Sequence, residues 1–233
     1  MTMETLSKKA NISKKALPVH PLEVSLGYLG VKLEQMLFVK HKRQVMQVTL
    51  LSDPQTSKIV KRYYGLMDSE GNYGPQHPFI LNEIKAMKSV RHPNIMKLER
   101  AVNDPLGNSI LLLMSRCSRG SVTDRMKSGM TSKQLAKYFV QTACALRYLH
   151  NNEIIHGDVK PCNIFVNDSD DAVLGDFGGA HILTDGETRI STWGGSPGFI
   201  APEFFKPGVE VNAYKVGNFL RTDLIWAWET SRD

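Results

Sequence analysis

The side chains of this chain that could move a proton or hold a metal ion are concentrated in two short segments. Residues 156–163 read His-Gly-Asp-Val-Lys-Pro-Cys-Asn, and after twelve intervening residues the chain reads Asp-Phe-Gly at 176–178. Asp158 could accept or orient the proton of a hydroxyl group, with Lys160 beside it to neutralise negative charge. Asn163 and Asp176 carry the oxygen ligands that Mg²⁺ prefers. This spacing indicates metal-assisted transfer of a negatively charged group.

Further short motifs surround these segments. Glu83-Ile84 is followed by His-Pro-Asn-Ile at 92–95, Tyr-Leu-His stands at 148–150, Gly-Ser-Pro at 195–197 and Ala-Pro-Glu at 201–203. The order and spacing resemble a eukaryotic protein kinase domain over about residues 36–205, with His-Gly-Asp replacing His-Arg-Asp in the catalytic loop. The resemblance implies an α+β, bilobal protein-kinase-like fold, with a small β-rich N-lobe carrying one helix and a mainly α C-lobe. It also implies ATP and Mg²⁺ as cofactors and protein serine or threonine as the acceptor.

The resemblance also implies roles for individual residues. Asp158 is the expected catalytic base, and Lys160 is expected beside the transferring phosphate, as in the serine/threonine-specific branch of the family. Ser196 matches a Ser/Thr of the family's substrate loop, which favours the same branch. Asn163 and Asp176 are the expected Mg²⁺ ligands and therefore part of the nucleotide site.

The lysine that holds the nucleotide phosphates in this family lies on the third strand and pairs with a glutamate on the following helix. Ile59-Val60-Lys61 matches the end of that strand, and Glu83 matches the helix. Lys58 is the alternative lysine, and the match to the strand motif favours Lys61.

A second group of residues is expected to surround the adenine ring. Its members are Val45 above the ring, Met114 as the gatekeeper, Ser115 to Cys117 with backbone groups at its edge, and Phe165 beneath it. Ile59 replaces the small alanine that usually covers the ring, so we expect Ile59 and Phe165 to narrow the pocket.

The loop that covers the phosphates departs from the family pattern. Counted back from Lys61, its three glycines fall on Phe38, Lys40 and Arg43. Glycine lets backbone amides approach the phosphates closely, and side chains at these positions crowd or replace that contact. Two interpretations stay open: Lys40, Lys42 and Arg43 bind phosphates through their side chains, or the loop no longer binds nucleotide properly.

Gly157 is a second departure. Much of the family has an arginine here, which pairs with a phosphorylated residue of the activation segment, so activation by that route is not expected. Four hydroxyl-bearing residues between Asp176 and Glu203 remain candidates for another modification: Thr184, Thr188, Ser191 and Thr192.

The periodicity of the chain predicts the elements that position these residues. Runs rich in branched and aromatic residues at 36–40, 45–51 and 58–64 predict a meander of three strands. Apolar residues at helical spacing predict a helix over 79–90, and two further strands are expected at 96–103 and 109–115. A long helix is expected over 132–150, capped by Thr131 or Ser132, with short strands near 164–166 and 173–174.

These elements divide the chain into four parts. Residues 1–21 are basic and lack periodicity, so we expect a mobile basic tail. The kinase N-lobe is expected over 22–114, the hinge over 115–120 and the C-lobe over 121–233.

The C-lobe is expected to be truncated, because only 30 residues follow Glu203. The aspartate that anchors the catalytic loop in the family falls near Gly217, or at Asp223 if residues are inserted. A lobe that ends here should expose apolar surface, including Trp226 and Trp228, which a regulatory protein partner could cover.

The composition excludes disordered and fibrous classes, since 42% of the 233 residues are hydrophobic and 22% are charged. The longest apolar run, residues 110–114, is far shorter than the roughly 20 residues of a membrane-spanning helix. No signal-type segment begins the chain, and the three cysteines have neither paired nor metal-ligand spacing. We therefore expect a cytoplasmic protein, with the nucleus as the alternative.

The net charge of +6 is concentrated in residues 36–62, where six lysines and arginines face one aspartate. A solvated basic face is the favoured interpretation, ahead of a surface for phosphates, nucleic acid or an acidic partner.

Three functional hypotheses follow. The first is a protein serine/threonine kinase that transfers the γ-phosphate of ATP, because the catalytic residues are all present. The alternative is a pseudokinase or truncated kinase-like regulatory module without efficient phosphotransfer, because the glycines are missing. The third is a basic surface for nucleic acid or phospholipid, whose signature would be a steep dependence of binding on salt.

Overall fold

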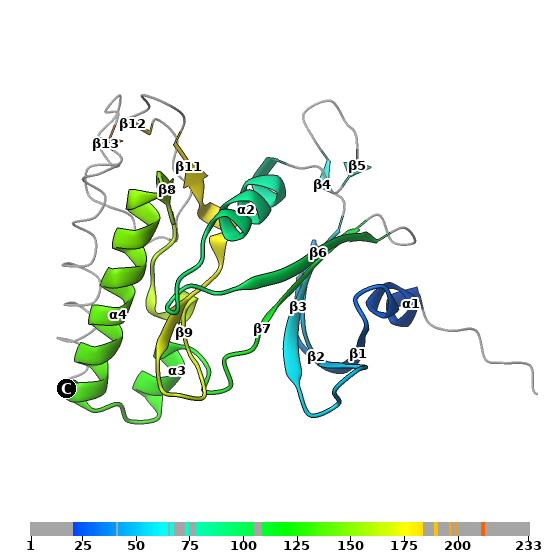
Figure 1. Ribbon diagram of the computed structural model, residues 1–233, viewed down its shortest axis with the longest axis horizontal. Helices are drawn as coiled ribbons and strands as arrows, with labels where there is room; N and C mark the ends of the chain where they lie inside the picture. Colours follow the sequence, from blue (N-terminus) through cyan, green and yellow to red (C-terminus); the bar gives the residue numbers. More distant parts are fainter. Residues whose placement is uncertain are drawn as a thin grey trace, which may run out of the picture.

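The computed structural model describes residues 21–40, 42–64, 66–67, 73–74, 78–104, 109–183, 189–190 and 211–212, together with Ser196 and Phe199. It shows a β-rich N-terminal part and a mainly helical part that follows it, so the predicted α+β, two-lobed architecture is confirmed (Figure 1). Some expectations lie outside the described residues: the tail over 1–20, the candidates Thr184, Thr188, Ser191 and Thr192, the Ala-Pro-Glu motif at 201–203, and Gly217, Asp223, Trp226 and Trp228.

The N-terminal part is built on a five-stranded sheet in the order β1-β2-β3-β7-β6, with every neighbouring pair antiparallel. Its strands are β1 (Val31–Lys40), β2 (Arg43–Leu50), β3 (Ser57–Tyr64), β6 (Leu98–Asp104) and β7 (Ser109–Ser115). The five predicted strands are all present, and β1 begins earlier than the sequence pattern indicates. The predicted helix is α2 (Pro78–Ser89).

Each face of the sheet packs into its own hydrophobic core. Leu111 and Leu113 of β7 point into one core with Val60. Leu112 and Met114 point into the other core, which continues through α2 into the C-terminal part. Because β7 is buried on both faces, its apolar residues form an uninterrupted run rather than an alternating one.

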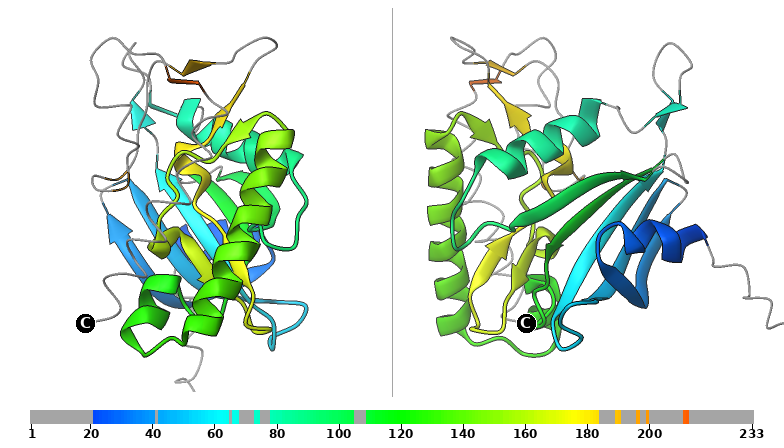
Figure 2. Two further views of the ribbon diagram at one scale, coloured as in Figure 1. Left: turned by 90° about the vertical axis from the view of Figure 1, so that its left-hand side faces the viewer. Right: turned by 45° about the vertical axis from the view of Figure 1, so that its right-hand side comes forward.

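A helix that the sequence analysis did not predict, α1 (Pro21–Gly27), packs against β1 and covers the first of these cores (Figures 1 and 2). Leu26 and Leu29 are almost fully buried there. Pro21 indicates a chain break when the sequence is read alone, but a proline is well tolerated in the first turn of a helix, where its missing N–H has no helical partner. The N-terminal part therefore has two helices rather than the one expected.

The C-terminal part is organised around α4 (Ser132–Asn151), which matches the predicted long helix. Its N-cap is Thr131, whose hydroxyl oxygen accepts the N–H of Gln134. The shorter α3 (Val122–Lys127) was not predicted, because six residues are too few to show helical periodicity. The remaining described elements are β8 (Ile154–Ile155), η1 (Pro161–Asn163), β9 (Ile164–Val166), β10 (Ala172–Leu174), η2 (Phe177–Gly179) and β11 (His181–Ile182), with two short pairs, β4 (Leu66–Met67) with β5 (Tyr73–Gly74) and β12 (Arg189–Ile190) with β13 (Val211–Asn212).

A buried polar cluster joins α1 to the sheet. Arg62 of β3 pairs with Asp104 at 2.7 Å, and the side chains of both residues are at most 7% exposed. Ser25 of α1 donates to the same carboxylate at 2.8 Å, and Ser109 of β7 donates to it at 2.9 Å. One buried carboxylate therefore holds α1, β3, β6 and β7 together.

We expect Asp104→Ala to lower the free energy of unfolding by about 3–5 kcal/mol, because it leaves Arg62 buried without this partner. Urea denaturation followed by circular dichroism measures the loss. Lys137→Ala is the matched control: its ion pair with Asp171 is about 40% exposed and should be worth less than about 1 kcal/mol. Similar losses in the two variants would contradict this account of the cluster.

Candidate active site

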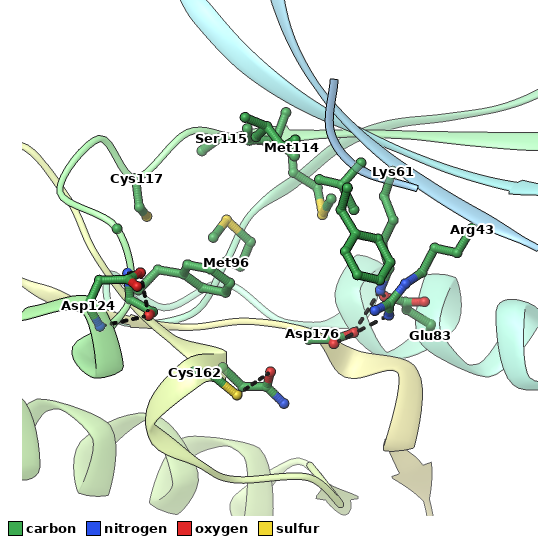
Figure 3. Close-up of a pocket in the computed structure, with 18 residues that line it drawn as sticks. Arg43, Lys61, Glu83, Met96, Met114, Ser115, Cys117, Asp124, Cys162 and Asp176 are labelled. Atoms are coloured by element: carbon green, nitrogen blue, oxygen red, sulfur yellow. Dashed lines mark hydrogen bonds and ion pairs between the residues drawn. The ribbon is translucent and has the colours of Figure 1, made fainter. Parts of the chain in front are cut away.

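One large pocket lies between the sheet and the C-terminal part, with a cavity volume of about 620 Å³ (Figure 3). All nine residues predicted to bind the nucleotide line it: Val45, Lys61, Glu83, Met114, Ser115, Cys117, Asn163, Phe165 and Asp176. Ile59 and Phe165 also line it, yet the volume falls well within the roughly 300–1,000 Å³ of small-molecule sites. These two side chains therefore shape the pocket without closing it.

Lys61 of β3 is the cationic centre of the pocket. Its Nζ lies 2.7 Å from Glu83 Oε1 of α2 and 2.7 Å from Asp176 Oδ1 (Figure 3). Lys58, the alternative phosphate lysine, instead pairs with Glu99 at 2.6 Å and does not line the pocket. The structure thus brings together the lysine and glutamate that the sequence pattern favours.

The charge of Lys61 is fixed by its neighbours. Burial alone lowers the pKa of an ammonium group, but the negative charges of Glu83 and Asp176 outweigh burial and raise the pKa of Lys61 above its ordinary value. Lys61 is therefore protonated at neutral pH and available to neutralise an anion.

Tyr63 holds the second oxygen of Glu83. Its hydroxyl donates to Glu83 Oε2 at 2.5 Å, and its ring lies 5.0 Å from the Nζ of Lys61. Burial raises the pKa of Tyr63, so the hydroxyl keeps the proton that it donates. The sequence analysis did not single out Tyr63, although its position two residues after Lys61 places it on the same face of β3.

Asp176 adopts an unusual backbone conformation, with φ of 58° and ψ of 72°, which is uncommon for a residue other than glycine. The turn directs its carboxylate toward Lys61 and toward Arg43, whose Nη1 lies 3.5 Å from Asp176 Oδ2. Although burial opposes ionisation, the charges of Lys61 and Arg43 lower the pKa of Asp176 far below its usual range. Asp176 is therefore a carboxylate at neutral pH.

The catalytic-loop residues form a second polar group at the edge of this pocket. Asp158 Oδ2 accepts from Lys160 Nζ at 2.6 Å and from Asn163 Nδ2 at 2.9 Å. Asp158 Oδ1 accepts the backbone N–H of Ser196 at 3.1 Å, and the Lys160 ammonium also donates to the Ser196 hydroxyl. Burial raises the pKa of Asp158, but the hydrogen bonds from Lys160 and Ser196 give a net lowering. The carboxylate is therefore ionised and positioned.

The donor set fits a hard divalent cation. Asp176 contributes an ionised carboxylate to the pocket, and Asn163 contributes an amide whose nitrogen donates to Asp158. That donation identifies the other atom of the amide, Oδ1, as the acceptor. One carboxylate and one amide oxygen in the same pocket match the ligands that Mg²⁺ takes in nucleotide sites.

His156 connects the two polar groups through the backbone. Its Nε2 lies 2.9 Å from the carbonyl oxygen of Gly175, and its Nδ1 lies 3.4 Å from the backbone nitrogen of Asp158. A neutral ring protonated on Nε2 satisfies both contacts, as donor to Gly175 and acceptor from Asp158. Complete burial lowers the pKa of His156 to about 4, so the neutral ring prevails at physiological pH.

Gly157, the unusual residue of the catalytic loop, has a positive φ of 86°. A Cβ atom at this position would overlap the carbonyl oxygen of Gly179 in η2. The catalytic loop and the Asp-Phe-Gly turn therefore approach each other so closely that only glycine fits without a backbone shift.

The three positions of the missing glycines lie on the β1–β2 hairpin, where Lys40 pairs with Arg43 and Phe38 pairs with Val45. Phe38 and Arg43 line the pocket, whereas Lys40 does not; its Nζ lies 5.7 Å from the centre of the Phe38 ring. Side chains thus occupy the place expected for backbone amides.

Several lining residues were not identified from the sequence. They include Leu37, Met96, Ser121, Asp124 and Cys162. Cys162 lies within the motif at 156–163 and could have been inferred from its position there. Ser121 and Asp124 form the capping box of α3, whose short length hid it from periodicity analysis.

Comparison with known families agrees with this geometry. The family model described as the protein kinase domain matches residues 55–218. The match covers more than half of the chain and includes the motifs at 83–84, 156–163 and 176–178. The chain belongs to the protein kinase domain family.

Curated relatives carry kinase names. A probable serine/threonine-protein kinase of Dictyostelium discoideum is 40% identical over 126 residues, which cover 53% of this chain and 17% of that protein. The SNF1-like protein kinase ssp2 of Schizosaccharomyces pombe is 32% identical over 155 residues (64% and 26%). A calcium/calmodulin-dependent protein kinase kinase of Caenorhabditis elegans is 31% identical over 130 residues (55% and 24%). The matched part is thus about a quarter or less of each relative.

Within the described part of this chain, every helix is too short or too polar to cross a bilayer.

Removing the Tyr63 hydroxyl tests how Glu83 is held. Tyr63→Phe should lower the free energy of unfolding by about 1–3 kcal/mol, because a buried carboxylate oxygen loses its donor. Tyr64→Phe is the matched control: it removes a hydroxyl that donates to the neutral amide of Gln44 at 2.6 Å, and its cost should be about 0.5–1.5 kcal/mol. Urea denaturation measures both, and a larger loss for Tyr64→Phe would contradict this account of Glu83.

His156 predicts a specific dependence of stability on pH. In the unfolded chain a histidine titrates near its ordinary pKa of about 6.5, so as pH falls the unfolded state takes up this proton before the folded state does. The contribution of His156 to stability is therefore complete above about pH 6.5 and is lost as the pH falls toward about 4.

We expect His156→Gln, which cannot titrate, to lose less stability than the wild type between pH 7 and pH 5, by on the order of 2 kcal/mol. Urea denaturation of both proteins at pH 7, 6 and 5 measures the difference. Parallel stability curves would show that His156 is not the group responsible.

Proposed function

We propose that this domain transfers the γ-phosphate of ATP to serine or threonine hydroxyl groups of proteins. The observation that carries the proposal is the pairing of Asp158 with Lys160 and Ser196 beside the pocket that holds Lys61, Glu83 and Asp176. Phosphoryl transfer needs mainly positioned groups and neutralised charge, which these two clusters supply.

The chain's own residues divide the work between the two clusters. Lys61, fixed by Glu83, is placed to hold phosphate oxygens, and Asp176 with Asn163 is placed to hold Mg²⁺. A bound Mg²⁺ would draw negative charge from the phosphate oxygens. Met114, Ser115 and Cys117 also line the pocket, and the adenine would lie against them.

Asp158 is placed to accept the proton of the incoming hydroxyl. Its carboxylate already accepts hydrogen bonds from Lys160 and Ser196, and these bonds keep it ionised. The Lys160 ammonium lies 2.6 Å from that carboxylate and is placed to neutralise charge on the transferring phosphate. The contact of Lys160 with the Ser196 hydroxyl supports a serine or threonine acceptor, since both residues match that branch of the family.

A regulatory module that binds nucleotide without transferring phosphate is the second candidate. It is favoured by Phe38 and Arg43, which stand in the pocket where glycine amides are expected. The nucleic-acid hypothesis has less support, because Lys58, Lys61 and Arg62 of the basic stretch are paired with acidic side chains inside the protein.

Asp158→Asn tests the proposal directly. We expect it to lower the transfer of labelled γ-phosphate from ATP with Mg²⁺ to a generic serine/threonine substrate by about 100-fold or more, because the hydroxyl loses its base. Asp168→Asn is the matched control, since Asp168 is exposed, lies outside the pocket and undergoes the same change of charge.

Both variants should unfold at a denaturant concentration near that of the wild type, so that a loss of transfer cannot be ascribed to unfolding. Equal transfer by wild type and Asp158→Asn would contradict the proposed role of Asp158. A folded wild-type protein that binds ATP without transferring phosphate would favour the regulatory module instead.

A further inference from the structure

Arg43 is the feature of the pocket that neither the family pattern nor the proposed reaction accounts for. It is the first residue of β2 and stands where the third glycine of the phosphate-covering loop is expected. Its Nη1 lies 3.5 Å from Asp176 Oδ2, while Lys61 Nζ lies 2.7 Å from Asp176 Oδ1 (Figure 3). Each oxygen of this carboxylate therefore faces a protein cation.

The arrangement changes the charge of the pocket. Lys61, Glu83 and Asp176 alone sum to one negative charge, which would attract a divalent cation. Arg43 brings this set to neutrality, and a guanidinium group keeps its charge at every physiological pH. A metal ion that binds Asp176 Oδ2 must therefore compete with Arg43.

The Arg43 side chain is accessible to a further ligand besides Asp176. Its side chain is 36% exposed and that of Asp176 is 27% exposed, so neither end of the ion pair is locked in a dry interior. The guanidinium carbon lies 5.2 Å from the centre of the Phe38 ring, which supports the side chain beside the cavity. A planar guanidinium with several N–H donors also matches the geometry of phosphate oxygens.

The other cations of the hairpin are placed differently. Neither Lys40 nor Lys42 lines the pocket, and Lys42 is exposed at the turn. Arg43 alone among these three residues combines a place in the pocket wall with an ion pair to Asp176.

We propose that Arg43 is a nucleotide-phosphate ligand that also competes with Mg²⁺ for Asp176. This inference rests on the proposed nucleotide site and assigns the missing contribution of the glycine amides to one side chain. When a nucleotide enters, the guanidinium, which has several N–H donors, bridges the Asp176 carboxylate and the phosphate oxygens. Nucleotide then binds without metal, and Mg²⁺ is needed at a higher concentration than in a pocket without Arg43.

The experiment measures binding rather than turnover. A fluorescent ADP analogue is titrated into the purified chain, first in EDTA and then at increasing Mg²⁺. Arg43→Gln should weaken binding in EDTA by about tenfold or more, because a phosphate ligand is lost. It should also lower the Mg²⁺ concentration at half-saturation severalfold, because the competitor for Asp176 is gone.

Two variants on the same hairpin serve as controls. Lys42→Gln removes the same charge outside the pocket and should change each value by less than about twofold, because exposed charges are strongly screened. Arg43→Lys keeps the charge and should retain most of the binding seen in EDTA. Thermal unfolding without nucleotide checks that each variant is folded. We expect all of them to fold, because the Arg43 side chain is only partly buried.

The opposite signs of the two shifts distinguish this proposal from simple damage to the pocket, which would weaken both kinds of binding. Unchanged binding in EDTA, or weaker binding of both nucleotide and Mg²⁺, overturns it. If Arg43→Gln behaves like wild type while phosphate transfer proceeds, this inference fails and the proposed kinase function stands. If the opposite shifts appear without any transfer, the inference stands and the kinase function fails.

Discussion

Lys61 is an ammonium group buried in the protein, and its charge constrains the placement of three separate segments. A buried cation is tolerated only when opposite charges and hydrogen bonds surround it. Glu83 must therefore approach from α2 and Asp176 from the turn that precedes η2, each to 2.7 Å. Tyr63 then fixes the other oxygen of Glu83. The distance between the sheet, α2 and the Asp-Phe-Gly turn follows from the need to pair this one charge.

Arg62, the next residue of β3, is a second buried cation, and it needs an acidic partner on the opposite face of the sheet. Since neighbouring residues of a strand point to opposite sides, Arg62 lies beneath α1 and pairs there with Asp104. Strand β3 thus carries a buried cation on each face, one turned toward the active site and one toward α1. These contacts join α1, which lies outside the pocket, to the strand that carries Lys61. We therefore expect a shift of α1 against the sheet to alter the position of Lys61 through β3.

The sequence indicated the parts of this site that depend on residue type and spacing, and missed the parts that depend on contacts across the fold. Asp158, Asn163 and Asp176 stand at fixed intervals in short motifs, and Lys61 with Glu83 was identified from its place in the strand and helix pattern. The contact of Arg43 with Asp176 joins residues far apart in the sequence, and nothing near either residue signals it. Likewise, α1 is too short for periodicity to reveal, and its burial depends on the sheet that it covers.

The close approach of Gly157 to Gly179 bears on how this site is controlled. An arginine at position 157 would force the backbone of the Asp-Phe-Gly turn to move, so the chain cannot hold this turn and also carry the usual arginine for a phosphorylated activation segment. The contacts that position the catalytic groups are instead made by residues present without any modification: His156 to Gly175, Ser196 to Asp158, and Lys61 to Glu83. Of the two cations that face Asp176, Lys61 follows the family pattern, whereas Arg43, which faces Oδ2, does not. Under the proposed role of Arg43, the hairpin that covers the phosphates therefore influences metal binding at Asp176 directly, through one side chain.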